Sequence, residues 1–370
     1  MKARIQHLYL PPNRRILAVS DVHGNLAYLR GALEKVGFCR EDVLIFVGDI
    51  IEKGAQSLET LRYIMDLRRT HTVYAVEGNC DGWQTRCLPT PNSETEQLLR
   101  KWIVHGLQSW HGRCLLAQMC DEIGFARSED MDLGQMWDAL HRAFPEEFDF
   151  LTNLPTVIET EHYTFVHGGL PEGDPDTWDA YACMKNDSFL TQGRKMEKWC
   201  IVGHWPVMLY GGDTTCANPI IDREKKIISI DGGCVLKDDG QLNVLVIPRN
   251  GSEEFSHVAY DPFPVRRVKT AQAGSEKSAY IRWGDNLVRV LERGEEFSLC
   301  EHVRTGYRME ILTKFLYGQE GELWHANDCT DYILPLSPGD EVSIVEETGR
   351  GYLCKHKGTS GWYFGELEEG

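Results

Sequence analysis

The chain has 370 residues, of which 42% are hydrophobic, and a formal net charge of −17 at pH 7. This length is enough for a large buried core and favours two domains. The acidic balance excludes broad nucleic-acid binding, which needs a basic face that displaces counterions, although it allows a local basic pocket for one phosphate.

The sequence carries no signal for a membrane or for export. It has no stretch of about 18 apolar residues, so no membrane span is expected. The first residues lack the apolar core of a signal peptide. Twelve cysteines are scattered without a regular frame and without a CxxC pair, which argues against a disulfide scaffold and a zinc ribbon. These features predict a cytoplasmic protein with reduced thiols.

The first 80 residues alternate the signals of buried strands and amphipathic helices. Short apolar runs at 16–19, 43–47 and 72–76 are typical of buried strands. Between them, apolar residues at helical spacing mark one helix face at 26–36 and another at 58–67. This β-α-β-α-β order predicts a sheet with parallel strands and helices that cover its faces.

The middle of the chain changes pattern. Residues from about 84 to 155 are typical of a mostly helical insert. Strand-like apolar runs then return at 163–166, 201–202, 227–230 and 244–247.

The last third of the chain changes composition again. Residues 250–280 are rich in Gly, Pro, Ser and charge, which favours a linker. Further on, the turn signal Ser337-Pro338-Gly339-Asp340 and the aromatic run Gly361-Trp362-Tyr363-Phe364 indicate short strands and a small β-barrel. The predicted domains are a first domain at 1–250, a linker and transitional segment at 251–306, and the barrel at 307–370.

Polar residues that suit a divalent metal follow five of the predicted strands. Because ligands bind at the carboxyl ends of strands in open α/β sheets, we expect these motifs to lie close together. Aspartate supplies hard oxygen ligands, histidine a neutral nitrogen and asparagine a carbonyl oxygen. Each motif alone is a weak signal, but five in order predict a metal site. The motifs are Asp21-Val22-His23-Gly24-Asn25, Gly48-Asp49-Ile50-Ile51-Glu52-Lys53-Gly54, Gly78-Asn79-Cys80-Asp81, His167-Gly168-Gly169 and Gly203-His204.

A carboxylate such as Asp49 can hold two ions at once. Two ions about 3.5–4 Å apart acidify a shared water and clamp the oxygens of a phosphate. The glycines beside the polar residues let the backbone turn sharply and let a ligand approach closely. The motifs therefore predict hydrolysis of a phosphate ester.

The order and spelling of the motifs resemble the calcineurin-like metallophosphoesterases, nearest to the protein serine/threonine phosphatase branch and its bacterial relatives. That branch carries Gly-Asp-x-His-Gly, Gly-Asp-x-x-Asp-Arg-Gly, Gly-Asn-His-Glu, His-Gly-Gly and Gly-His. The resemblance covers about residues 14–248, apart from the insert. It implies an α/β fold, a calcineurin-like β-sandwich of mixed sheets flanked by helices, which refines the single sheet that the strand pattern suggested. The helical insert and a small C-terminal β-barrel complete the expected architecture.

The resemblance also implies two divalent metal ions, with manganese or iron favoured and zinc compatible with the mixed oxygen and nitrogen ligands. Asp231-Gly232-Gly233 resembles a late loop near the metals and is equally well read as a simple turn. The implied ligands are Asp21, His23 and Asp49 for the first ion, and Asn79, His167 and His204 for the second, with Asp49 bridging.

Four further residues carry candidate roles toward the substrate. Lys53 stands where the phosphatases have an arginine that grips phosphate oxygens; lysine supplies the charge without a bidentate fork. Where the phosphatases have an Asp–His pair, this chain has Glu52 and Cys80. Asn25 is a candidate for substrate binding, and capping of the helix that begins there is the favoured alternative.

Cys80 keeps two interpretations open. In the phosphatases the histidine at this position protonates the leaving oxygen, and a thiol with a pKa ordinarily near 8.5 is a poor substitute. Gly-Asn-Cys-Asp also occurs in a small bacterial phosphodiesterase branch, so Cys80 shifts the expected preference toward diesters or activated monoesters. The alternative is a packed, inert thiol.

The C-terminal segment resembles a bacterial SH3-like domain, through residues 336–342 and Gly361-Trp362-Tyr363. Such domains bind peptides, cell-wall fragments or their own chain, so a peptide partner is expected for it.

Three functions stay open from the sequence. The first is a serine/threonine-phosphatase-like phosphoesterase that uses a hydroxide bridging two metals on a phosphorylated protein or a small phosphoester, with Glu52, Lys53 and Cys80 as catalytic candidates and Lys53 and Asn25 as substrate contacts. The second is a phosphodiesterase or dinucleoside polyphosphate hydrolase. The third, from another class, is a catalytically weak metal-binding scaffold that acts through the SH3-like domain.

Overall fold

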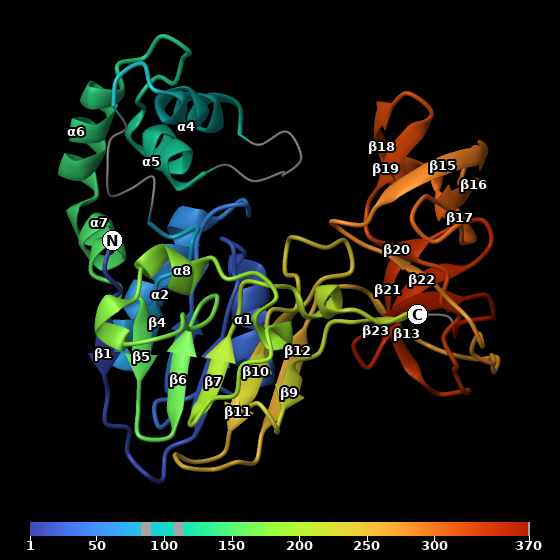
Figure 1. The fold of residues 1–370 in the computed structure, drawn as a ribbon, viewed down its shortest axis with the longest axis horizontal. Helices are drawn as coiled ribbons and strands as arrows, with labels where there is room; N and C mark the ends of the chain where they lie inside the picture. Colours follow the sequence, from blue (N-terminus) through green and yellow to red (C-terminus); the bar gives the residue numbers. More distant parts are fainter. Residues whose placement is uncertain (83–89, 107–113, 369–370) are drawn as a thin grey trace. The chain divides into compact units, whose positions relative to one another are not determined.

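The computed structural model describes residues 1–82, 90–106 and 114–368. Its backbone divides into two compact units, which are coloured along the chain in Figure 1. No helix among the described residues is long and apolar enough to cross a membrane. Unit 1 contains residues 1–206, 219–235 and 241–261, and unit 2 contains residues 207–218, 236–240 and 262–370.

The first sheet of unit 1 has the strand order β12-β11-β2-β3-β4. Strands β2, β3 and β4 are parallel, β11 is antiparallel to β2, and β12 is antiparallel to β11. The three strands predicted near the N-terminus are present with the expected bounds. The strands are β2 (Ile16–Val19), β3 (Val43–Val47), β4 (Thr72–Val76), β11 (Leu242–Ile247) and β12 (Ser256–Tyr260).

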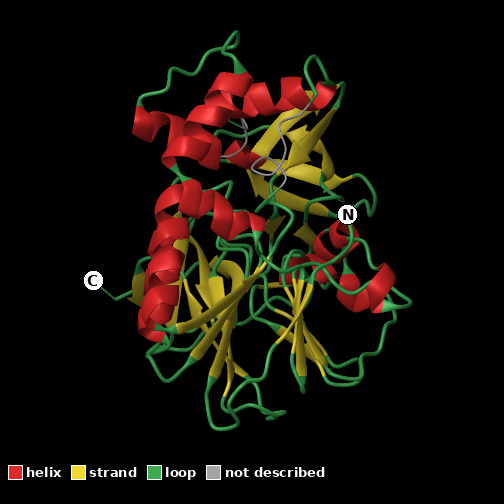
Figure 2. Cartoon of the chain, turned by 90° about the vertical axis from the view of Figure 1, so that its left-hand side faces the viewer, coloured by secondary structure: helices red, strands yellow, loops and turns green. Residues whose placement is uncertain are grey.

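The second sheet of unit 1 has the order β1-β5-β6-β7-β10-β9 and is also mixed. Strand β6 is parallel to β7 and β7 to β10, whereas β5 and β6 are antiparallel. Figure 2 shows the two sheets of unit 1 stacked, which confirms the sandwich that the family resemblance implied. The strands are β1 (Ile5–His7), β5 (Val157–Glu159), β6 (Tyr163–Val166), β7 (Trp199–Val202), β9 (Ile220–Asp222) and β10 (Ile227–Ser229).

Strand β2 shows why these strands are continuous apolar runs. Successive side chains of a strand point to opposite faces of the sheet. Ile16 and Ala18 join the core between the two sheets, and Leu17 and Val19 join the core under the helices. Because both faces of the strand are buried, every position is apolar.

Helices α1 (Leu26–Lys35) and α2 (Ser57–Thr70) cover the outer face of the first sheet. The predicted helical insert contains α4, α5, α6 and α7 in its described part, while residues 83–89 and 107–113 lie outside the described residues. Its apolar side chains, such as Met119 and Met136, extend the core under α2. The bounds are α4 (Glu94–His105), α5 (Leu115–Ile123), α6 (Leu133–Ala143) and α7 (Pro145–Thr152), followed later by the short α8 (Ala180–Met184).

Unit 2 consists mainly of two antiparallel sheets of five strands each in its described residues, with a pair formed by β14 (Tyr280–Ile281) and β20 (Cys329–Thr330). One sheet has the order β13 (Val265–Arg267), β21 (Glu341–Glu347), β22 (Tyr352–His356), β23 (Thr359–Tyr363) and β8 (Thr215–Cys216). The other has the order β17 (Arg308–Leu312), β16 (Phe297–His302), β15 (Leu287–Glu292), β19 (Leu323–Ala326) and β18 (Leu316–Glu320).

The C-terminal third differs from its prediction in two respects. The expected linker and transitional segment at 251–306 contains the strands β12 to β16. These strands are short and partly exposed, and the Gly and Pro residues of this range lie outside them, so the composition indicated a linker. The expected barrel at 307–370 shares its sheets with strands from earlier in the chain, β8 among them. An SH3-like classification of this part stays a prediction.

Candidate metal centre

The predicted metal ligands lie in the loops that follow β2, β3, β4, β6 and β7 of unit 1. Asp49 lies at the centre of the cluster: its Oδ1 atom is 3.3 Å from His167 Nε2, and its Oδ2 atom is 3.7 Å from His23 Nε2. The Nε2 atom of His23 is also 3.6 Å from Asp21 Oδ1. The two sheets thus bring four of the predicted ligands together from distant parts of the chain.

The other two predicted ligands, His204 and Asn79, border the same cluster. The centroid of the His204 ring is 5.1 Å from that of the His167 ring, and the backbone N–H of His204 donates to Asp21 Oδ2 at 2.9 Å. The side-chain nitrogen of Asn79 donates to Cys80 Sγ at 3.3 Å. All six residues therefore lie in or beside one cluster.

Four of these six residues have a left-handed backbone conformation, which is uncommon for residues other than glycine. Such strain costs of the order of 1–3 kcal/mol per residue and is concentrated at functional sites in proteins. The surrounding loops therefore hold the side chains in directions that relaxed loops would not adopt. The φ angles are 54° for Asp21, 49° for His23, 51° for Asp49 and 66° for His204.

The cluster is buried and strongly polar. The residues Asp21, Asp49 and His167 are each at most 1% exposed. Burial raises the pKa of Asp21 to about 6, with attraction to His167 opposing the shift and repulsion from Asp49 adding to it. Burial opposes the charge of His167, but attraction to Asp49 and Asp21 raises its pKa to about 10. Positive charge is thus favoured at this position, and a bound cation would supply it.

Four buried polar atoms of the predicted ligands make no hydrogen bond among the described residues, although His167 Nε2 forms the ion pair with Asp49 given above: Asp21 Oδ1, His23 Nδ1, Asn79 Oδ1 and His167 Nε2. A buried polar atom without a partner costs about 1–3 kcal/mol, so such atoms are rare in folded proteins. A carboxylate oxygen, an amide oxygen and an imidazole nitrogen are all donors that divalent metals accept. The residues present therefore fit a metal site.

Asp49 belongs to two groups of three residues whose potential ligand atoms lie within 4.8 Å of one another. One group is His23, Asp49 and Cys80, and the other is Asp21, Asp49 and His167. A carboxylate common to both groups is suited to bridge two ions.

Lys53 and Cys80 lie against this cluster. The Nζ atom of Lys53 is 3.4 Å from His23 Nε2; burial opposes its charge, but Cys80 and Asp49 raise its pKa above the ordinary value. The backbone N–H of Cys80 donates to Asp49 Oδ1 at 2.8 Å. Burial, with repulsion from Asp49, raises the pKa of the Cys80 thiol well above its usual range. Lys53 and Cys80 thus place an ammonium group and a buried thiol beside the predicted ligands.

Glu52 and Asn25 make contacts with helix ends. The Oε1 atom of Glu52 accepts from the backbone N–H of Leu115, the first residue of α5, at 2.9 Å. A carboxylate is favourable at a helix N-terminus, so Glu52 connects the Lys53 loop to the insert. The side chain of Asn25 accepts from Tyr28 N and caps α1, which favours the capping interpretation of this residue.

Asp81 ends the Gly78-Asn79-Cys80-Asp81 motif, and the sequence alone predicts no role for it. It is fully buried, and its carboxylate accepts from the backbone N–H groups of Gly78 at 2.7 Å, Asp49 at 2.8 Å and Ile50 at 2.8 Å. It therefore joins the loop of Asp49 to the loop of Asn79. Its place in the Gly-Asn-Cys-Asp motif was the available signal.

Asp231, Asp187 and Lys185 also belong to the surroundings of the centre. Asp231 is fully buried, and burial together with Asp21 raises its pKa well above the usual range, which favours its interpretation as a residue near the site. Asp187 Oδ1 is 2.7 Å from His204 Nε2, and Lys185 Nζ is 3.2 Å from the same nitrogen. Asp187 and Lys185 lie in an irregular segment after α8, where no motif marks them.

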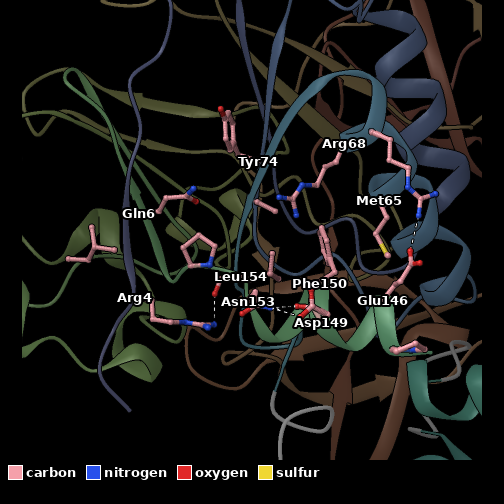
Figure 3. Close-up of a pocket in the computed structure, with 15 residues that line it drawn as sticks. Arg4, Gln6, Met65, Arg68, Tyr74, Glu146, Asp149, Phe150, Asn153 and Leu154 are labelled. Carbon is pink, nitrogen blue, oxygen red and sulfur yellow. Dashed lines mark hydrogen bonds and ion pairs between the residues drawn. The ribbon is translucent and has the colours of Figure 1, made fainter. Parts of the chain in front are cut away.

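A pocket of about 810 Å³ lies elsewhere on unit 1, beside β4, β1 and α7 (Figure 3). Its lining includes Arg4, Arg68 and Tyr74 and none of the six predicted ligands. The predicted ligands therefore lie outside this pocket.

Comparison with known proteins gives a family match over most of unit 1. A family model described as calcineurin-like phosphoesterase matches residues 14–226. A symmetrical bis(5'-nucleosyl)-tetraphosphatase of Pseudomonas fluorescens (strain SBW25) is 29% identical over 170 residues, and one of Methylococcus capsulatus is 30% identical over 171 residues. These alignments cover 44% and 46% of this chain and 57% and 46% of the relatives. The chain thus spans about half the length of the curated relatives it matches.

Two solved structures are similar at a low level. A Saccharomyces cerevisiae protein serine/threonine phosphatase with similarity to human phosphatase PP5 has a TM-score of 0.43 and 13% identity, and the match covers 71% of this chain and 85% of that one. A metallophosphoesterase of Sphaerobacter thermophilus has a TM-score of 0.38 and 16% identity, with 67% and 88% covered.

Proposed function

Because the chain belongs to the calcineurin-like phosphoesterase family, we propose that it hydrolyses phosphate esters with two divalent metal ions. The observation that carries this proposal is the position of Asp49, which is common to two groups of close potential ligands. The strained backbone at Asp21, His23 and His204 supports it, because the fold maintains these conformations at a free-energy cost.

The six predicted ligands divide between the two ions by position. When bound, such ions acidify a water and neutralise charge on the phosphate oxygens. The resemblance to the family favours manganese or iron as the two ions. We assign Asp21, His23 and Asp49 to the first ion, and Asn79, His167 and His204, with Asp49 bridging, to the second.

Residues beside the ligands bind the phosphate or orient other parts of the site. Lys53 supplies a positive charge for the phosphate oxygens as a point charge, because lysine lacks the fork of arginine. Glu52 holds the first turn of α5 and so positions the insert beside the Lys53 loop. The Nε2 atom of His204 donates a hydrogen bond to Asp187 Oδ1 at 2.7 Å, which orients the His204 ring.

A dinucleoside polyphosphate is the second candidate substrate, beside a phosphoprotein or small phosphomonoester. The curated relatives reported above are symmetrical bis(5'-nucleosyl)-tetraphosphatases, and Cys80 stands in place of the phosphatase histidine. Loss of that proton donor disfavours alkyl monoesters, whose leaving groups are poor, more than it disfavours phosphoanhydrides. A cytoplasmic location and a peptide partner for the C-terminal segment stay predictions.

The test is hydrolysis by purified, manganese-loaded protein of p-nitrophenyl phosphate, bis-p-nitrophenyl phosphate and diadenosine tetraphosphate. Asp49→Asn removes the shared carboxylate, and Asp66→Asn, which changes an exposed carboxylate of α2, is the matched control. We expect hydrolysis that Asp49→Asn abolishes and Asp66→Asn preserves. Equal rates for Asp49→Asn and the wild type, or no hydrolysis with manganese, iron or zinc, would refute the proposal and favour the scaffold alternative.

A further inference from the structure

The chain passes from unit 1 to unit 2 three times, so each unit is made of several separate segments. The chain leaves unit 1 after Pro206, returns at Pro219, leaves again after Val235, returns at Gln241 and leaves finally after Asp261. A terminal module on a tether would need one such passage. Two internal segments, the first excursion (207–218) and the second excursion (236–240), are therefore built into unit 2 before its main part begins.

The first excursion follows a predicted ligand of the metal centre, and the second follows a residue of its surroundings. The first begins three residues after His204, whose backbone N–H donates to Asp21 Oδ2. The second begins five residues after Asp231, whose Oδ1 atom accepts from Gly233 N–H at 2.8 Å. Because an extended residue spans at most about 3.6 Å, a shift of either excursion reaches the site residue through a short length of chain.

The first excursion is an integral part of a sheet in unit 2. Its strand β8 pairs with β23, with Thr215 opposite Ser360 and Cys216 opposite Thr359. Next to the strand, Ala217 N–H donates to the carbonyl of Gly358 at 2.9 Å. These ladder hydrogen bonds anchor the segment that follows His204.

The second excursion is held by a buried ion pair and a hydrogen bond. Lys237 pairs with Asp328, and the two side chains are only 8% and 14% exposed. Asp239 accepts a hydrogen bond from Ser360 Oγ. At the base of the loop, Gln241 N–H donates to the carbonyl of Gly232 at 3.0 Å, one residue from Asp231. Removing one partner of a buried ion pair leaves an uncompensated charge and is destabilising.

We propose that unit 2 is a positioning element of the phosphoesterase site, which acts by holding the loops that carry His204 and Asp231. Lys237 is the positioning residue of the second loop, and β8 anchors the first. The inference rests on the proposed function, in which His204 is a metal ligand. It predicts that full metal affinity requires unit 2.

The test uses the full-length protein with Lys237→Met, which removes the charge that neutralises Asp328. Lys237→Arg is the conservative rescue. Ser298→Ala is the matched control, because it removes a buried side-chain hydrogen bond of unit 2, to Thr313 at 2.8 Å, that involves neither excursion. Three quantities are measured: the Mn²⁺ dissociation constant by electron paramagnetic resonance, amide hydrogen exchange of peptides that cover 203–206 and 230–235, and the thermal unfolding midpoint.

We expect Lys237→Met to weaken Mn²⁺ binding about tenfold, the lower end of the effect of outer-shell changes at metal sites, and to speed exchange at 230–235. Lys237→Arg and Ser298→Ala should retain wild-type affinity and exchange, even where Ser298→Ala lowers the midpoint. Ser360→Ala, which removes the Asp239 hydrogen bond without burying a charge, should change both readouts less but in the same direction.

Affinity and exchange in Lys237→Met within twofold of the Ser298→Ala values would overturn the proposal. Exchange and metal affinity do not require turnover. A wild-type protein that binds manganese but hydrolyses none of the test substrates with manganese, iron or zinc would therefore refute the proposed function, while the comparison of the variants would still decide the positioning role.

Discussion

Replacing Asp81 by asparagine tests how the loops of the metal centre are held. Its two carboxylate oxygens accept from the backbone N–H groups of Gly78, Asp49, Ile50 and Ile51, at 2.7, 2.8, 2.8 and 3.3 Å respectively. Asparagine keeps one acceptor oxygen and puts an NH₂ group in place of the other, so two buried N–H groups lose their acceptor.

The magnitude follows from the two lost acceptors. At about 1–3 kcal/mol for each unsatisfied buried donor, Asp81→Asn should lower the free energy of unfolding by about 2–6 kcal/mol. Because the same N–H groups hold the Asp49 and Asn79 loops, we also expect Mn²⁺ affinity to fall about tenfold or more.

Urea denaturation followed by circular dichroism measures the first quantity, and isothermal titration with Mn²⁺ measures the second. Asp66→Asn, at an exposed surface ion pair with Arg69, is the control and should change stability by less than about 1 kcal/mol. A stability loss for Asp81→Asn no larger than that of the control would refute the reasoning.

Three further predictions concern other contacts of unit 1. Glu52→Ala removes the acceptor of Leu115 N–H and should lower the thermal midpoint more than Glu52→Gln, which keeps an acceptor oxygen; equal midpoints in differential scanning fluorimetry would contradict this. Burial opposes the ionisation of Asp42, but Arg15 lowers its pKa below the ordinary value, so its contribution to stability is present at neutral pH and is lost as pH falls through the folded-state pKa. Asp42→Asn should therefore destabilise the protein in urea at pH 7 and lose this effect in acid, below the folded-state pKa; a penalty that is constant with pH would refute the ion-pair explanation. Removal of metal with a chelator should lower the midpoint of the wild type and leave that of Asp49→Asn nearly unchanged, since binding to the folded state alone stabilises it.

The buried strands could be predicted because their signal is local. Both faces of β2, β3 and β4 are covered, so each reads as a continuous apolar run. The two-sheet arrangement followed from family resemblance, since apolar runs do not say which strands share a sheet. The strands between 251 and 306 were missed because many of their positions are exposed, as in β12, and no apolar run marks them.

The candidate ligands could be predicted for a similar reason, because each follows an apolar run within a short motif. Residues that act through backbone hydrogen bonds carry no comparable signal. Asp81 accepts from residues about 30 positions away in the chain, and Asp187 reaches His204 from a segment without regular structure. Their roles depend on which loops the sandwich brings together.

The sequence by itself determined the core strands and the order of the candidate ligands, because these are properties of short stretches of chain, and its composition determined the acidic net charge. Only the tertiary structure decided that residues 215–216 pair with 359–360 and that Lys237 is neutralised by Asp328. Both contacts join segments that are far apart in the chain, and each segment alone reads as an ordinary turn or short strand. The physical reason is that pairing of an edge strand or a buried charge depends on the partner that folding supplies, and that partner is not encoded in the neighbouring residues.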